Sequence, residues 1–96
     1  MAGSPPSTIT FAIWAPIARR DLPGLCDRVC ALLAESGATV AVCDVAGAAV
    51  DAVTVDALAR LALAARRRRC RIQLRHASEE LRNLVAFMGL EDVLAP

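Results

Sequence analysis

The side chains of this 96-residue chain that could do chemistry are its acids, a few hydroxyls, four cysteines and one histidine. Two pairs of carboxylates are candidates for general acid–base work: Asp51 with Asp56, and Glu91 with Asp92. Both pairs also suit helix or turn starts, where an acid is stabilised by the positive end of the helix dipole. We expect this capping and solvating role for both pairs.

A nucleophile and base are not suitably paired in the sequence. Ser78 comes two residues after His76, so the two side chains are expected to point in different directions. Ser78 is better used as a helix N-cap, since Glu79 and Glu80 follow it. No glycine-rich phosphate loop is found either. We therefore predict no catalytic residue and no cofactor, with an enzyme or a nucleotide-binding domain as the alternative.

The four cysteines are not spaced like a metal site. Cys26 and Cys30 are four residues apart and would share one helix face, whereas Cys43 ends an apolar run and Cys70 begins another. No CxxC pair is present, and there is only one histidine. We expect reduced cysteines in the core, where a free cysteine acts as a small hydrophobe. A redox or metal role is the alternative.

Composition and charge narrow the class of protein. Apolar residues make up 56% of the chain and charged residues 22%, as in a globular domain. We expect one domain at residues 8–96 after a disordered lead at 1–7, which lacks a signal-peptide pattern. The net charge of +1 gives no case for nucleic acid, and no apolar run reaches the roughly 18 residues of a membrane span. A cytoplasmic protein without membrane insertion is expected.

Hydrophobic periodicity predicts alternating strands and helices. We expect strands at 8–14, 38–46 and 71–75, and helices at 21–36, 51–68 and 78–88. The apolar run 38–46 is typical of a central strand with both faces buried. Because helices separate the strands, the strands should be parallel and the fold α/β. The arginine run 66–69 is expected to be a solvated helix end, with an anionic partner surface as the alternative.

The loop after the second strand is the most informative segment. An α/β protein normally places its working surface at the carboxyl ends of its strands. Residues 50–58 occupy this place and carry two acids and one hydroxyl, that of Thr54. The function therefore has to be inferred from this loop and from the sequences that flank it.

Three parts of the chain resemble the STAS domain, the family of bacterial anti-sigma factor antagonists and of the cytoplasmic domains of sulfate transporters. The resemblance covers about Ile9 to Leu94. The first part is the strand 40–47, which is similar to a family strand that ends in Asp-Leu-Ser-Gly. The second is the loop 50–58 with the helix residues 64–67, which stand in the place of the family's Asp-Ser-Ser-Gly-Leu loop and its following helix. The third is similar to the family's last strand and helix and consists of the segments 72–74, 77–82 and 88–94.

The resemblance implies a mixed sheet flanked by helices on one side, without catalytic chemistry of its own. Typical members begin with a strand pair, whereas one strand alone is clear at 8–14, so the N-terminal hairpin is expected to be shortened. Family members bind protein partners through the loop placed here at residues 51–56. In the anti-sigma antagonists a kinase phosphorylates the second serine of this loop, and the added charge breaks the contact.

This chain departs from the family at the switch position. Asp51 aligns with the loop aspartate and Ala52 with the first serine, while Val53 stands where the phosphorylated serine would be. A valine cannot accept phosphate. Thr54 is the only hydroxyl in the loop and is either a displaced phosphoacceptor or an N-cap or first-turn residue of the following helix.

The leading hypothesis is a non-enzymatic STAS-type protein-binding module, an anti-sigma factor antagonist-like regulator with a non-phosphorylatable switch position. Its partner would be an anti-sigma factor kinase. The alternative is a STAS subunit of a lipid-trafficking ABC transporter. Homodimerisation through the first strand, where Phe11 or Trp14 would be exposed, is a further hypothesis. The predicted contact surface consists of Asp51, Ala52, Val53, Thr54, Asp56 and Leu63.

Overall fold

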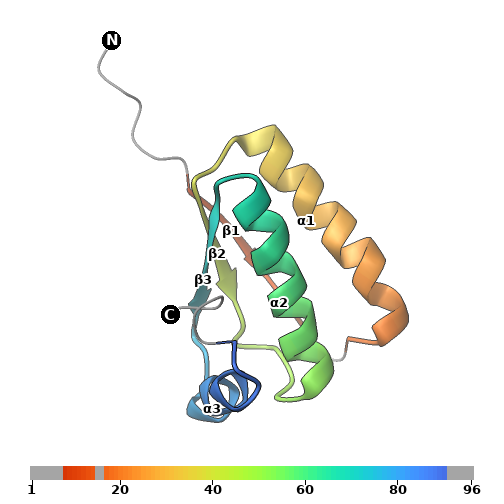
Figure 1. The fold of residues 1–96 in the computed structure, drawn as a ribbon, viewed down its shortest axis with the longest axis vertical. Coiled ribbons are helices and arrows are strands. Elements are labelled where there is room, and N and C mark those ends of the chain that lie inside the picture. Colours follow the sequence, from red (N-terminus) through yellow and green to blue (C-terminus); the bar gives the residue numbers. More distant parts are fainter. Residues whose placement is uncertain (1–7, 15–16, 91–96) are drawn as a thin grey trace.

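A computed structural model of the chain describes residues 8–14 and 17–90 (Figure 1). Strands and helices alternate along the chain, which confirms the predicted α/β class. The elements are β1 (Thr8–Ala12), a 3-10 turn η1 (Arg19–Asp21), α1 (Leu22–Ser36), β2 (Val40–Asp44), α2 (Ala52–Arg67), β3 (Arg71–Arg75) and α3 (Glu79–Phe87). The predicted lead at 1–7, the Glu91–Asp92 pair and most of the STAS-like segment 88–94 lie outside the described residues.

The sheet has the order β1-β2-β3, with β2 in the centre. Both pairings are parallel, and the rungs run in register from Thr8–Val40–Arg71 to Ala12–Asp44–Arg75. Over the described residues the sheet is therefore parallel rather than mixed. One strand alone precedes α1 there, so no hairpin supplies an antiparallel neighbour.

Helices α1 and α2 lie side by side on one face of the sheet (Figure 1). Each connects two neighbouring parallel strands, and right-handed crossovers in the same direction place both helices on the same face. Helix α3 packs against α2 near the carboxyl ends of the strands. The expected flanking on one side is thus observed for α1 and α2.

The two faces of the sheet differ in burial. On the helix side, Ala41 and Cys43 of β2 are fully buried. On the other side, Val40 and Val42 are half-buried, and their neighbours in β1 and β3 are polar or exposed. The prediction of a central strand was right, but the prediction that both its faces are buried was wrong, because no described helix lies on the second face.

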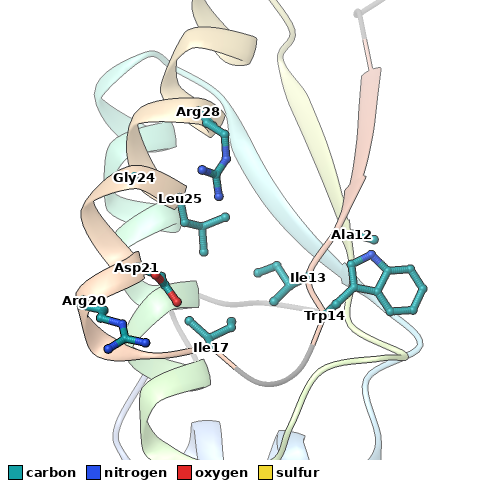
Figure 2. A pocket seen from close by; sticks show the side chains of 9 residues that line it. All are labelled: Ala12, Ile13, Trp14, Ile17, Arg20, Asp21, Gly24, Leu25 and Arg28. Atoms are coloured by element: carbon teal, nitrogen blue, oxygen red, sulfur yellow. The ribbon is translucent and has the colours of Figure 1, made fainter.

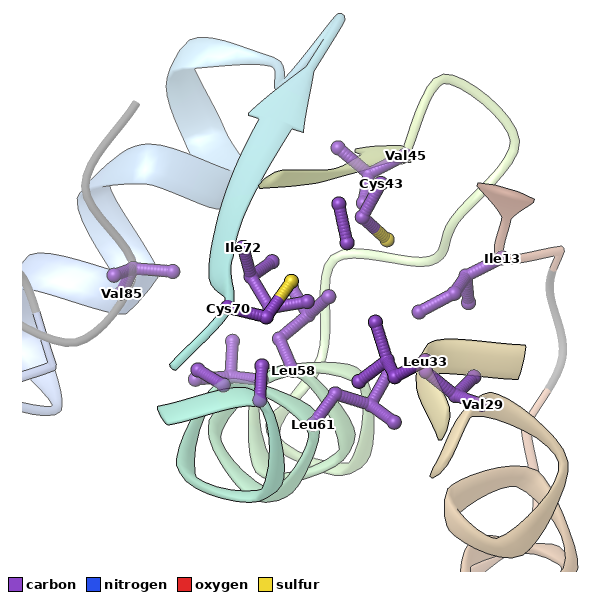
Figure 3. Close-up of a cluster of buried hydrophobic side chains, with 14 of the residues drawn as sticks. Ile13, Val29, Leu33, Cys43, Val45, Leu58, Leu61, Cys70, Ile72 and Val85 are labelled. Carbon is purple, nitrogen blue, oxygen red and sulfur yellow. The ribbon is translucent and has the colours of Figure 1, made fainter. Parts of the chain in front are cut away.

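The core forms where α2 meets the sheet and α1 (Figure 3). The apolar stripe of α2 is entirely buried: Val55, Leu58, Leu61, Ala62 and Ala65. The apolar stripe of α1 is buried less completely. Leu22, Val29 and Leu33 are buried, but Leu32 is 36% exposed, since α1 lies over the outer part of the sheet with α2 on one side of it.

Helix ends follow the predicted signals, with one exception. Gly37 has a φ of 61°, the left-handed conformation that ends α1 at small steric cost in glycine. The Ser78 hydroxyl accepts a hydrogen bond from the Leu81 amide and caps α3. Asp21, with which the predicted helix 21–36 begins, makes no side-chain capping bond and belongs to the 3-10 turn instead. The arginines at 66–69 are exposed, as expected for a solvated helix end.

All four cysteines are free thiols. Cys43 and Cys70 are buried, while Cys26 and Cys30 are half-buried. The residues that the structure describes contain no group of three or more His, Cys, Asp or Glu side chains placed to hold a metal ion. Among the described helices, none is long and apolar enough to cross a membrane.

The burial of α2 predicts very different effects of two leucine substitutions on the same helix. Leu58 is fully buried, whereas the side of α2 that carries Leu63 leaves that residue 49% exposed. We expect Leu58→Ala to lower the free energy of unfolding by about 2–5 kcal/mol, through lost burial and a residual cavity. Leu63→Ala, the matched control, should cost less than about 1 kcal/mol. Urea denaturation measures both, and equal costs would contradict this packing.

Candidate functional site

The loop between β2 and α2 is held at both ends by carboxylates. At its start, the Asp44 carboxylate accepts a hydrogen bond of 2.9 Å from the Ala46 amide. At its end, Asp51 is the N-cap of α2, and its Oδ1 accepts a 2.8 Å bond from the Thr54 amide. The predicted role of Asp51, to accept a backbone hydrogen bond at the helix start, is confirmed. The cap satisfies an amide that has no partner within the helix.

Small apolar side chains surround this cap. Val50 is 42% exposed, Ala52 is exposed, and Val53 is half-buried. The Asp51 cap fixes the backbone between them, so they are displayed on an ordered helix start. Sequence analysis singled out Ala52 and Val53 and missed Val50. The sequence signal that could have pointed to Val50 is its position directly before the capping acid, because this position often carries an apolar side chain.

Thr54 is not on this surface. Its side chain is fully buried, and its Oγ1 has no hydrogen-bond partner. A protein kinase cannot reach a hydroxyl in this position without local opening of the first turn of α2. The prediction that Thr54 is a first-turn residue of the helix is confirmed, while the N-cap is Asp51. The Thr54 backbone amide, and not its hydroxyl, takes part in the cap.

Asp56 is engaged by two arginines. Its carboxylate lies 3.2 Å from Arg19 Nη1 and 3.1 Å from Arg60 Nε. The hydrogen bond from Arg60 is the larger cause that holds the pKa of Asp56 below its ordinary value, and Arg19 adds to it. Asp56 therefore ties the 3-10 turn before α1 to α2. Leu63 lies seven residues further on the same side of α2, about 10 Å along the axis.

Asp44 and His76 form a pair that sequence analysis missed. His76 Nδ1 lies 3.3 Å from both carboxylate oxygens of Asp44. The pair forms because Asp44 ends β2 and His76 directly follows β3, and the carboxyl ends of neighbouring parallel strands meet at one edge. His76 has a φ of 61°, which is uncommon outside glycine. The predicted strand order was a signal that could have found this pair.

Among the described residues, no nucleophile forms a hydrogen bond with the Asp44–His76 pair. The hydrogen bonds of the His76 ring go only to Asp44 among the described residues. Cys43 is next to Asp44 in sequence, but its side chain points to the helix face, and burial raises its pKa to about 12. A thiol with that pKa is not a nucleophile at neutral pH. The described site therefore presents an oriented imidazole without a reacting partner.

Trp14 lies at the same end of the sheet. Its ring packs so closely on Gly47 that a Cβ at that glycine would come within 2.3 Å of the ring. Trp14 is nevertheless 71% exposed, as expected for this side chain near the first strand, whereas Phe11 packs against the core. The loop after β2 thus lies near one large exposed aromatic side chain.

Comparison with known proteins gives no family assignment. No protein-family model matches the chain, and no curated protein sequence matches it.

The buried hydroxyl of Thr54 predicts the effect of its removal. Valine has nearly the same shape and no polar atom to desolvate, so Thr54→Val should keep the free energy of unfolding or raise it by up to about 1 kcal/mol. Asp51→Ala, a change in the same turn, should lower it by about 1 kcal/mol through loss of the cap. Chemical denaturation compares the two. A loss above about 1 kcal/mol in Thr54→Val would mean that the hydroxyl has a partner.

The Asp44 carboxylate predicts a measurable pKa change. The Ala46 amide is the main cause that lowers the pKa of Asp44, and the hydrogen bond from His76 is a further cause. We expect His76→Ala to raise this pKa part of the way to its ordinary value, because the Ala46 bond is kept. Carbon-detected NMR titration of the carboxyl measures it. Arg82→Ala on α3 is the control, and an unchanged pKa in His76→Ala would refute the pairing.

Proposed function

We propose that the chain is a non-enzymatic, STAS-type protein-binding module, an anti-sigma factor antagonist-like regulator acting in the cytoplasm. The observation that carries this proposal is the capped start of α2, where Asp51 fixes the backbone and displays Val50, Ala52 and Val53. A rigid helix start with small apolar side chains suits docking to another protein, because little side-chain entropy is lost on contact.

The described chemistry of the loop supports binding over turnover. Both acids of the loop already make structural contacts: Asp51 caps α2, and Asp56 is paired with Arg19 and Arg60. Carboxylates engaged in this way keep their positions, so they frame a surface more readily than they move protons.

Contact through this loop would be constitutive. Val53 has no hydroxyl, and the Thr54 hydroxyl is buried. Phosphorylation of the loop is therefore not part of the proposal, and Thr54 is not proposed as a phosphoacceptor. The proposed partner is an anti-sigma factor kinase, and the module would bind it in its one, unphosphorylated state.

The burial of Thr54 also favours a second candidate, a STAS-type subunit of a lipid-trafficking ABC transporter. A structural subunit of that kind needs no phosphorylatable residue. Its partner would be the nucleotide-binding subunit of the transporter rather than an anti-sigma factor, and both candidates use the same loop.

The exposed apolar loop predicts that a charge at Val53 blocks partner binding. Burying an unpaired carboxylate in an interface is costly, so Val53→Asp should weaken binding at least about tenfold while the thermal unfolding midpoint changes little. Binding of the tagged protein is measured against a purified anti-sigma factor kinase and, separately, against the ABC nucleotide-binding subunit.

The matched control is Ala34→Asp, which places the same charge on the exposed side of α1. It should leave binding unchanged. Equal recovery of the partner by wild type and Val53→Asp would remove this loop from the interface. Binding to neither purified partner would refute both candidate functions.

A further inference from the structure

Over the residues that the structure describes, strand β1 is an edge of the sheet with a row of unpaired backbone groups. It pairs with β2 on one side only. The Ile13 amide donates to the Asp44 carbonyl, and in a parallel strand alternate residues face the same neighbour. The groups that point away from the sheet are therefore the amides and carbonyls of Thr8, Thr10 and Ala12.

A groove of about 420 Å³ lies beside this edge, between the end of β1 and the first turns of α1 (Figure 2). Its apolar lining includes Ile13, Ile17 and Leu25. The helix side of the groove is open at Gly24, where an added Cβ would meet the Arg28 guanidinium at an ordinary contact distance of 3.7 Å. The groove thus joins a free strand edge to an accessible apolar surface.

Two arginines give the groove a positive charge. Arg20 and Arg28 both line it, against a single acid, Asp21. Figure 2 shows the Arg28 side chain extending from α1 into the space beside β1. Neither arginine forms an ion pair with any residue in the described part of the chain. Their guanidinium groups are free to bind carboxylates, which they do with short, charge-assisted hydrogen bonds.

We propose that this groove binds an extended acidic segment of another protein, which adds to β1 as a fourth strand. Backbone hydrogen bonds to the outward groups of β1 would supply affinity, as in other cases of strand addition. Alternate side chains of a strand point to opposite faces, so the set on the helix side would enter the groove, where its apolar members meet the apolar lining and its acidic members meet Arg20 and Arg28. A second copy of β1 fits less well, because two such grooves would bring four unpaired arginines together.

The groove shares no residue with the loop at Val50–Val53, so it is a second binding surface beyond the proposed function. The probe is the fluorescein-labelled octapeptide Val-Thr-Glu-Thr-Val-Thr-Glu-Thr, which places its valines and glutamates on the same face of a strand, and its counterpart has lysine in place of glutamate. Fluorescence anisotropy should give saturable binding of the acidic peptide that weakens as salt is raised, and much weaker binding of the basic one.

Two sets of variants separate the backbone and charge contributions. The Thr10 amide points outward, so Thr10→Pro removes a donor from the edge and leaves the β1–β2 bonds in place, as edge strands tolerate. It should weaken acidic-peptide binding at least about tenfold, and Thr10→Ala should not. Arg20→Gln and Arg28→Gln should each weaken it, whereas Arg82→Gln, the same charge change on α3, should have no effect.

Equal binding of the acidic peptide by wild type and by the Arg20→Gln, Arg28→Gln double variant would overturn the proposal, even if Thr10→Pro failed to fold. So would equal affinity for the two peptides, or no saturation. A dimer in sedimentation that Thr10→Pro abolishes would identify a second copy as the occupant and also overturn it. Val53→Asp should bind the peptide normally, so failure of this groove and failure of the loop are distinguishable.

Discussion

The burial of one face of α2 is the interaction on which the rest of the structure depends. Leu58 and Leu61 have no exposed surface and lie where the sheet, α1 and α3 converge. A helix buried this deeply cannot shift or rotate without losing several kcal/mol of apolar burial. The position of the loop before α2, the salt bridges of Asp56 and the direction of the Asp51 cap are all fixed by this packing.

The same packing explains why the candidate surface is small. In the first turn of α2, Thr54 and Val55 turn inward, and only Ala52 and Val53 stay near the surface. The hydroxyl of Thr54 is buried without a partner, an arrangement that costs free energy and that the surrounding apolar burial has to offset. Binding through this loop therefore relies on shape and apolar contact.

In a sheet of three parallel strands with helices on one face, the backbone groups of the edge strands and the second face of the sheet stay accessible to solvent. Parallel sheets are usually covered on both faces, and here Val40 and Val42 are half-buried on the second face. The edge at β1 is open as well, with Arg20 and Arg28 beside it. A domain of this size has few elements with which to cover its sheet, which makes its edges natural sites for partners.

The sequence by itself determined the elements and most of their ends. Periodicity gave the buried stripe of α2, and Gly37, Asp51 and Ser78 end or begin helices through local backbone chemistry. Tertiary structure alone decided which of the loop side chains are reachable, and it brought Asp44 to His76, residues 32 positions apart. Helix caps and hydrophobic periodicity depend on residues that are close in sequence. Burial and pairing across strands depend instead on how the helices pack on the sheet.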